Sequence, residues 1–221
     1  MDDDVRFTAG LLSLSDAARF LGIPRQTFQR WARGYQRGAP LLHVLDDQGR
    51  QAPTTFIALA EAWVLWALRE AGVRPHRIRP ALDRLRSQFG REYVLIAPEL
   101  ATDGIDVLWD FARSDEGEGL IEGGTGQHVI REIVADHLQY LTWREDGYPG
   151  LLRLRHCEPA KVVIDPERAF GQPIFAGSRV RMADVAGMLK AGEKAAVVAE
   201  ELGVSVEDVR TAARVVLGRA A

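Results

Sequence analysis

Arginine and glutamine side chains are concentrated in one short stretch near the N-terminus. The candidate DNA-contacting residues in this stretch are Arg25, Gln26, Thr27, Gln29, Arg30 and Arg33. Arginine recognises guanine and glutamine recognises adenine, because each side chain can make two hydrogen bonds to the base edge in the major groove. We therefore predict base contacts from Arg25, Gln26 and Gln29, with Arg30 and Arg33 nearer the phosphates.

Two short helices joined by a tight turn are expected to position these side chains. Ser13–Leu21 is predicted to be the first helix, because Ser13 can cap it with Asp16 three positions on. Gly22 supplies the left-handed residue that ends this helix, and Pro24 opens a second helix that ends at Gly34. Such a helix-turn-helix presents its second helix to the major groove. The structural alternative is a helical hairpin that serves only packing, since it would have the same outer face.

The residues that follow predict a winged-helix domain. Leu41–Leu45 and Thr54–Ile57 are predicted to be two strands, with the turn-forming Asp46–Gly49 between them, so we predict a β-hairpin. Two helices should follow, over Leu59–Ala71 and from Pro75 or Arg77 to about Phe89. A helix-turn-helix, a hairpin and two further helices together form the layout of a winged-helix domain, which we place at residues 1–91.

The last predicted helix of this domain is rich in arginine. Residues 69–91 hold seven arginines, against only Glu70 and Asp83 as acidic residues. One interpretation is a helix that contacts phosphates, with Arg77 and Arg79 as its DNA-contacting residues. The other is a solvated helix face whose apolar residues point to the core, and both can hold at once.

Beyond residue 91 we predict a mainly helical α+β fold with two further domains. The expected elements of a small α+β middle domain at residues 92–160 are strands at Tyr93–Ile96, Asp106–Phe111, Leu120–Glu122 and Leu151–Arg155, and a helix at Gln127–Trp143. Residues 161–221 should form a domain of three helices with features of a helix-turn-helix. Its expected elements are a strand at Val162–Asp165, part of a strand at Val180–Arg181, and helices at Ala183–Ala191, Lys194–Leu202 and Val206–Leu217.

Charge and cysteine usage restrict the class of protein. Residues 1–91 carry 14 arginines and 9 acidic residues, whereas residues 92–221 carry 14 basic and 22 acidic residues. A basic front and an acidic rear fit a DNA-binding module joined to another module. The single cysteine, the acidic start of the chain and the shortness of the apolar Phe56–Leu68 stretch predict a cytoplasmic protein with no membrane partner.

The sequence offers no convincing catalytic constellation. The five histidines lack the spacing of a metal site, and Cys157 has only the neighbouring His156 as a possible base. Gly123–Gly126 precedes a predicted helix but lacks the lysine of a phosphate-binding loop. We therefore predict no catalytic residues, no metal and no cofactor, and hence a protein that is not an enzyme.

Both ends of the chain resemble known families. Leu12–Pro24 resembles the opening of MerR-like winged helix-turn-helix domains, and Thr55–Ala62 with Leu68–Val73 is similar to the DNA-binding domain of one group of VapB-type antitoxins. The C-terminal part resembles a small helical family, first catalogued as a domain of unknown function, that is common in antitoxins paired with PIN-like toxins. The segments that carry this second resemblance are Val163–Pro166, Phe170–Val180 and Ala191–Glu193.

The resemblance implies a type II antitoxin that neutralises a PIN-like ribonuclease toxin and represses its own operon by binding operator DNA. The alternative is a one-component MerR-like regulator whose middle domain binds a small ligand. We expect a homodimer in either case, because one short helix reads too few base pairs. The last predicted helix opens with Glu207 and Asp208, which would repel phosphate, so we favour an interaction role for the C-terminal domain, as a dimer or toxin contact.

Overall fold

The computed structural model describes residues 4–35, 39–45 and 52–218 of the chain. The chain forms two compact units that alternate along the sequence. The first unit comprises Met1–Gln29, Val44–Phe56 and Gly150–Ala221, and the second comprises Arg30–His43 and Ile57–Pro149. Helix α3 (Arg25–Arg33) therefore begins in one unit and ends in the other.

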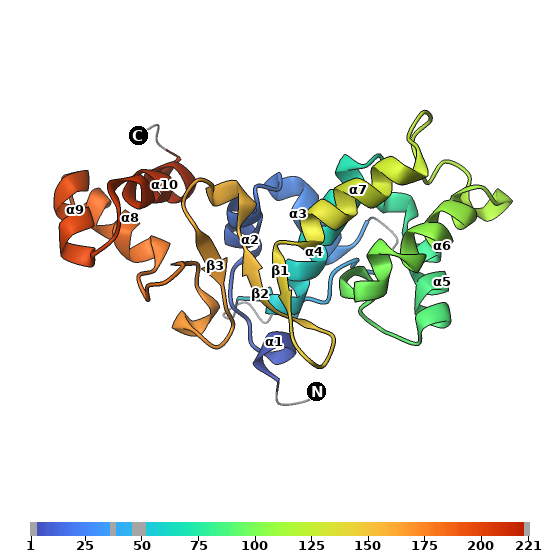
Figure 1. The fold of residues 1–221 in the computed structure, drawn as a ribbon, viewed down its shortest axis with the longest axis horizontal. Helices are drawn as coiled ribbons and strands as arrows, with labels where there is room; N and C mark the ends of the chain where they lie inside the picture. The colour runs from blue at the N-terminus through green and yellow to red at the C-terminus, as the bar shows by residue number, and fades with distance from the viewer. Residues whose placement is uncertain (1–3, 36–38, 46–51, 219–221) are drawn as a thin grey trace. The chain divides into compact units, whose positions relative to one another are not determined.

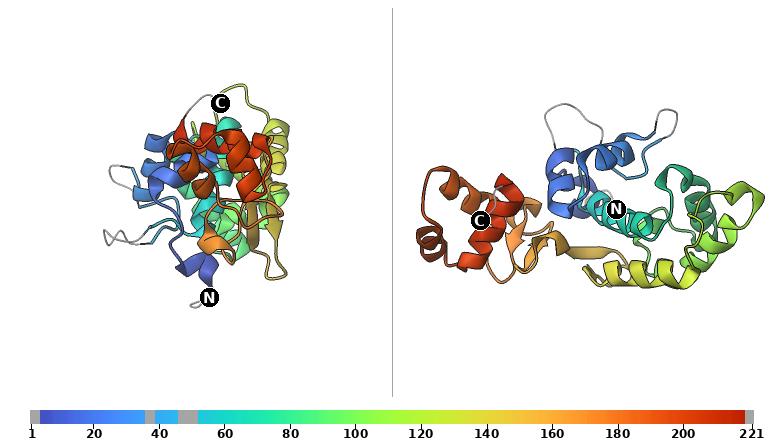
Figure 2. Two further views of the ribbon diagram at one scale, coloured as in Figure 1. Left: turned by 90° about the vertical axis from the view of Figure 1, so that its left-hand side faces the viewer. Right: turned by 90° about the horizontal axis from the view of Figure 1, so that it is seen from above.

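The first unit contains the start of the helix-turn-helix and the C-terminal helices. Its elements are α1 (Val5–Thr8), α2 (Leu14–Leu21), the first part of α3, β2 (Pro149–Arg153), η5 (Arg155–Cys157), β3 (Val162–Ile164), η6 (Ala169–Gly171), β4 (Ile174–Phe175), α8 (Met182–Lys190), α9 (Ala195–Leu202) and α10 (Val206–Leu217). The last three helices lie side by side in both Figure 1 and Figure 2, and valines of each are fully buried between them.

A small antiparallel sheet precedes these helices in the chain. The strands follow one another in the order β1-β2-β3-β4, and β1 is Leu141–Trp143. Leu152 of β2 is opposite Ile164 of β3, and Val162 of β3 is opposite Phe175 of β4. All three residues of β3 are buried, as expected for a central strand.

Local sequence signals account for the helix ends in the first unit. The Ser13 side chain accepts a hydrogen bond from the Asp16 backbone N–H at the start of α2, and Gly22 ends that helix in the left-handed conformation. Ser205 and Asp208 form a full capping box at the start of α10. These predictions, and the predicted bounds of α10, are confirmed.

The second unit is built around a buried helix. Its elements are the end of α3, α4 (Phe56–Glu70), η1 (Pro75–Arg77), α5 (Arg79–Phe89), η2 (Val94–Ile96), η3 (Pro98–Ala101), α6 (Asp103–Ala112), η4 (Asp115–Gly117), α7 (Gln127–Leu138) and β1. Helix α4 is apolar on nearly every side and buried along most of its length, which confirms the predicted core helix. Helices α5, α6 and α7 pack in chain order, α5 on α6 and α6 on α7.

Within the described residues the predicted β-hairpin lacks its strands, although one backbone hydrogen bond joins its two arms, from the Leu45 N–H to the Pro53 carbonyl at 2.8 Å. Residues 41–45 form no strand, and α4 begins at Phe56, inside the predicted second strand. Thr54 instead makes an isolated antiparallel bridge with Leu12, so its backbone bonding is satisfied by a segment near the N-terminus. The predicted turn at residues 46–49 lies outside the described residues.

Three predicted strands of the middle region are also wrong. Tyr93–Ile96 contains a short 3-10 helix, η2, since a short apolar run does not distinguish strand from helix. Asp106–Phe111 lies within α6, where Ile105, Leu108 and Phe111 recur at helical spacing and are buried. Leu120–Glu122 forms only a bridge, between Val73 and Ile121, and the helix predicted over Gln127–Trp143 ends at Leu138 before β1.

Val180–Arg181 was predicted to be part of a strand. The structure instead has an isolated antiparallel bridge between Ile174 and Arg181. The strand at Val162–Asp165 and the three C-terminal helices are confirmed to within about one residue at most ends. Among the described residues, no helix has both the length and the apolar character needed to cross a bilayer.

Candidate nucleic-acid interface

Helix α3 presents a polar face made of the residues predicted to contact DNA. Arg25, Gln26, Arg30 and Arg33 are exposed, whereas Thr27 and Gln29 are half-buried. On the opposite side of the helix Phe28 and Trp31 are completely buried. The sequence pattern therefore assigned the two faces of this helix correctly.

The spacing of the polar residues places most of them on one stripe. Gln26, Arg30 and Arg33 are separated by four and three positions, so their side chains follow one side of the helix. The side chains of Arg25, Gln26, Gln29 and Arg30 make no hydrogen bond or ion pair with the described part of the chain. Donor groups that are not engaged within the protein are available to a ligand.

The start of α3 is also electrostatically suited to an anion. Its first turn contains no acidic residue, and the free backbone N–H groups of a helix N-terminus carry partial positive charge. Arg25 adds a full positive charge at the first helical position. This end of the helix is therefore favourable for phosphate or for the electronegative edge of a base.

Backbone hydrogen bonds fix the two ends of α3. The Ile23 N–H donates to the Ala18 carbonyl across the turn, and the Phe28 N–H donates to the Pro24 carbonyl in the first helical turn. At the other end, the Leu41 N–H donates to the Trp31 carbonyl at 2.8 Å. The helix is thus held by neighbours in sequence at its start and by the following segment at its end.

Arg77 and Arg79, the predicted phosphate contacts of the arginine-rich region, are partly engaged within the second unit. Arg77 Nη1 donates to the Glu118 carbonyl at 2.7 Å. Arg79 Nη2 donates to the Pro40 carbonyl at 2.8 Å and also to the Ala39 carbonyl. Arg79 therefore holds the segment that follows α3, a role that spacing in the sequence did not indicate.

One further arginine of α5 is a candidate contact that the sequence reasoning did not single out. Arg84 is exposed, and within the described residues its side chain has no hydrogen-bond or ion-pair partner. Its membership of the arginine-rich 69–91 stretch was the signal that could have identified it. Arg74, by contrast, donates to the Gly119 carbonyl at 3.3 Å and lies 3.9 Å from a Glu122 oxygen.

Of the two neighbouring groups considered for catalysis, Cys157 is buried and His156 is exposed. Cys157 is fully buried, and burial raises the pKa of its thiol to about 12. Burial and the nearby Arg214 lower the pKa of His156. In the described ranges, no group of three or more His, Cys, Asp or Glu residues is arranged to hold a metal ion.

Known families match the two ends of the chain. Residues 10–82 match the family described as "Putative DNA-binding HTH domain", and residues 162–214 match the family described as "Protein of unknown function (DUF433)". The first match covers α2, α3 and α4 together with the polar face of α3. Fold, site and family therefore define a helix-turn-helix DNA-binding protein.

The full-length relatives narrow this class. A Mycobacterium tuberculosis protein named "Putative antitoxin VapB45" is 41% identical over 95% of this chain and 95% of its own length. The chain belongs to the VapB-type antitoxin family of that relative, which confirms the resemblance seen in the sequence. "Uncharacterized protein Rv2308" of the same organism is 26% identical over 90% of this chain and 86% of its own length.

A solved structure shows the same fold. The crystal structure of Rv2018 from Mycobacterium tuberculosis superposes with a TM-score of 0.75 at 37% identity. The match covers 94% of this chain and 99% of the Rv2018 chain. The mainly helical α+β architecture is therefore shared along the chain, and is not limited to the helix-turn-helix.

Proposed function

We propose that this chain is the antitoxin of a type II toxin–antitoxin system, that it neutralises a PIN-like ribonuclease, and that it represses its own operon as a homodimer bound to operator DNA. One observation carries the DNA-binding part of the proposal. The side chains of Arg25, Gln26 and Arg30 are exposed, whereas Phe28 of the same helix is buried, and the described residues do not engage these three side chains. The antitoxin part is supported by the relative named as an antitoxin.

Each residue of the predicted contact set has a proposed role. Arg25, Gln26 and Gln29 read base edges, and Thr27 lies beside them in the first turn. Arg30 and Arg33, further along α3, contact phosphates, as do the remaining N–H groups of Arg77 and Arg79. A homodimer carries two copies of this contact set and therefore binds an operator that contains two half-sites.

The C-terminal helices are better suited to a protein partner than to DNA. The first turn of α10 contains Glu207 and Asp208, and Asp208 is used in the capping box with Ser205. Carboxylates at the start of a would-be recognition helix repel phosphate. Arg214, which could offset them, donates to the carbonyls of His156 and Glu158 at 3.1 Å. We therefore assign toxin contact to this part of the chain.

The test combines a binding and an activity measurement. The full chain is co-expressed with the product of the adjoining gene, the two are co-purified, and RNA cleavage by that product is measured with and without the chain. A ribonuclease that co-purifies and is inhibited in a stoichiometric complex is expected. The proposal fails if no partner co-purifies and no ribonuclease is inhibited.

A second measurement separates the antitoxin from a ligand-responsive regulator. Binding to a duplex that covers the promoter of the chain's own gene is measured with the partner added in increasing amounts. The proposal predicts that the complex binds this duplex specifically. Release from the duplex by a small molecule, with no effect of any protein partner, would instead identify a one-component regulator.

A further inference from the structure

Phe170 is the most exposed large apolar side chain of the described residues. It lies in η6, within the C-terminal stretch that resembles an antitoxin-associated family, and 90% of its surface is accessible to solvent. A single exposed apolar residue is common on protein surfaces. Phe170 differs because the backbone that carries it is also unusual.

Three consecutive residues at this turn adopt left-handed backbone conformations. The φ angles are 49° at Ala169, 55° at Phe170 and 68° at Gly171. Glycine tolerates this region, but alanine and phenylalanine rarely adopt it, because the Cβ atom approaches the backbone. Strained conformations of this kind persist only where surrounding contacts enforce them, and they are concentrated at functional sites.

The turn is held in place by contacts within the first unit. The Gly171 N–H donates to the Arg168 carbonyl, and the Gln172 N–H donates to the Ala169 carbonyl. The Gln172 side chain also donates to the Leu11 carbonyl at 2.8 Å. A Cβ atom on Gly171 would lie 2.5 Å from the Leu11 side chain, so the turn is packed closely against that residue. The exposed ring is therefore carried by a well-supported backbone.

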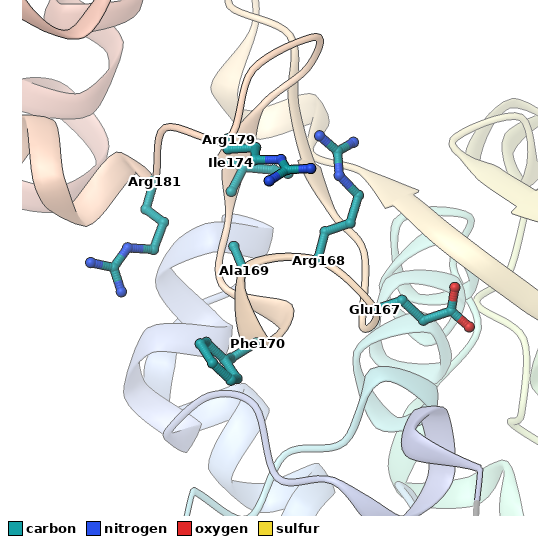
Figure 3. Close-up of a pocket in the computed structure, with 7 residues that line it drawn as sticks. All are labelled: Glu167, Arg168, Ala169, Phe170, Ile174, Arg179 and Arg181. Atoms are coloured by element: carbon teal, nitrogen blue, oxygen red, sulfur yellow. The ribbon is translucent and has the colours of Figure 1, made fainter.

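Arginines line a cavity beside this turn. An open cavity of about 460 Å³ lies beside the turn, and its walls include Arg168, Arg179 and Arg181, with Glu167 as the acidic residue. In Figure 3 the Phe170 ring projects from the turn and lies below Arg168, Arg179 and Arg181 in that view. The surface thus has an apolar projection and a rim that is positive on balance.

We propose that Phe170 is the anchor by which this chain holds its toxin, inserting into an apolar socket on that protein whose border carries a carboxylate that faces Arg179. This inference rests on the proposed function, since the partner is the ribonuclease named there. A rigidly presented aromatic side chain loses little conformational entropy on binding, and aromatic residues flanked by arginine are typical of binding hot spots.

The same residues argue against nucleic acid as the occupant. Arg168 donates to the Ser178 carbonyl at 2.9 Å, and Arg181 makes two hydrogen bonds to the Asp184 carboxylate. Nucleic-acid affinity depends on several cationic groups that neutralise phosphates. Here Glu167 and Asp184 would oppose phosphate, and Arg179 alone has no partner among the described residues.

A second copy of this chain is also a poor occupant. In a two-fold symmetric contact the same surface faces itself. A contact centred on Phe170 would bring together two surfaces that are each positive on balance, with three arginines against Glu167 and Asp184. Like charges in such an interface are unfavourable, whereas carboxylates on a different protein would complement them.

Two variants of the full chain test the Phe170 ring independently of the strained backbone that carries it. Phe170→Asn removes the ring and keeps a residue that tolerates the left-handed region, so the melting temperature should be unchanged or raised. Ala169→Gly relieves strain at the neighbouring residue and keeps the ring. Binding of each purified variant to the ribonuclease from the adjoining gene is measured by calorimetry. We expect Phe170→Asn to weaken binding at least about 30-fold and Ala169→Gly to change it by less than about 3-fold.

The binding measurements can refute the Phe170 anchor separately from the antitoxin function. If the unmodified chain binds the ribonuclease and Phe170→Asn binds equally well, the anchor is refuted and the antitoxin function stands. If the unmodified chain does not bind the ribonuclease, the antitoxin function fails and the anchor fails with it. The anchor is also refuted if Phe170→Asn retains ribonuclease binding but loses binding to a single-stranded or promoter DNA, or loses self-association.

Discussion

The buried carboxylate of Glu61, on α4, pairs with both the backbone and the ring of His43. The His43 backbone N–H donates to Glu61 Oε2 at 2.9 Å, and His43 Nδ1 lies 2.7 Å from Glu61 Oε1. Only 1% of Glu61 is exposed, and the His43 ring also packs edge-on against Tyr93 at 4.5 Å between centroids. The segment after α3 is therefore attached to α4, the core helix of the second unit, by a partly buried polar contact.

Removing the His43 ring should destabilise the second unit. His43→Ala leaves one oxygen of the buried Glu61 carboxylate without its donor, which costs about 1–3 kcal/mol of unfolding free energy. Chemical denaturation followed by tryptophan fluorescence measures the change. His128→Ala, on the exposed side of α7, is the matched control and should change the unfolding free energy little. Equal effects of the two substitutions would contradict a stabilising role for the pair.

The same pair predicts how stability depends on pH. Burial lowers the pKa of His43, but the hydrogen bond and charge of Glu61 outweigh it, so this pKa is raised above its ordinary value of 6.5. The contribution of the charged ring is complete below about pH 6.5 and is lost as the pH rises through the raised pKa. The melting temperature should therefore fall over that interval in the parent chain and fall less in His43→Ala. Parallel pH profiles for the two proteins would refute this coupling.

Gly22 at the turn of the helix-turn-helix is constrained by both conformation and space. Its φ is 70°, and a Cβ atom there would lie 2.8 Å from His156 Nδ1. Gly203 has the same conformation, with a φ of 65°, and open space around it. Both glycine-to-alanine changes should cost about 1 kcal/mol for the left-handed backbone, and Gly22→Ala should cost more because His156 must move. Thermal denaturation of the two variants checks this, and an equal effect would show that His156 moves freely.

Predictions from the sequence were reliable where the signal and its structural consequence are neighbours in the chain. Ser13 with Asp16 and Ser205 with Asp208 mark helix starts, and Gly22 marks an end, because capping depends on residues within one turn. The predicted hairpin keeps one backbone bond, from the Leu45 N–H to the Pro53 carbonyl, but Thr54 bridges to Leu12, and the residues of a segment do not by themselves reveal its partner.

The candidate site follows the same rule. The outward face of α3 was predictable because Phe28 and Trp31 mark the buried face of the same helix. The bond from Arg79 to the Pro40 carbonyl joins residues 39 positions apart, and no local pattern indicates it. The conformation of Phe170 was likewise out of reach, because it depends on contacts of its turn with Leu11.

Arg79 is expected to contribute to stability, and Arg77 and Arg79 together are expected to contribute to DNA binding, so the two properties are measured separately. Arg79→Ala removes donors to the Ala39 and Pro40 carbonyls, so it should lower the unfolding free energy by about 0.5–1.5 kcal/mol. Replacing both arginines by alanine should also lower the slope of log affinity against log salt, by about 1 for each arginine that binds a phosphate. A lower stability with an unchanged salt slope would show that both arginines serve the fold alone.

Gln26 and Arg30 lie one helical turn apart on the exposed face of α3. Their replacement by alanine should weaken DNA binding in two different ways. Gln26→Ala should cost about 1–3 kcal/mol on the promoter duplex and leave binding to unrelated duplexes unchanged, because it removes a base contact. Arg30→Ala should weaken binding to every duplex and reduce the salt slope by about 1, because it removes a phosphate contact. Fluorescence anisotropy at several salt concentrations measures both. Arg113→Ala, an exposed arginine at the end of α6, controls for the change in net charge. If Arg113→Ala weakens binding to every duplex as much as Arg30→Ala does, and Gln26→Ala has no effect, net charge governs binding and α3 does not read bases.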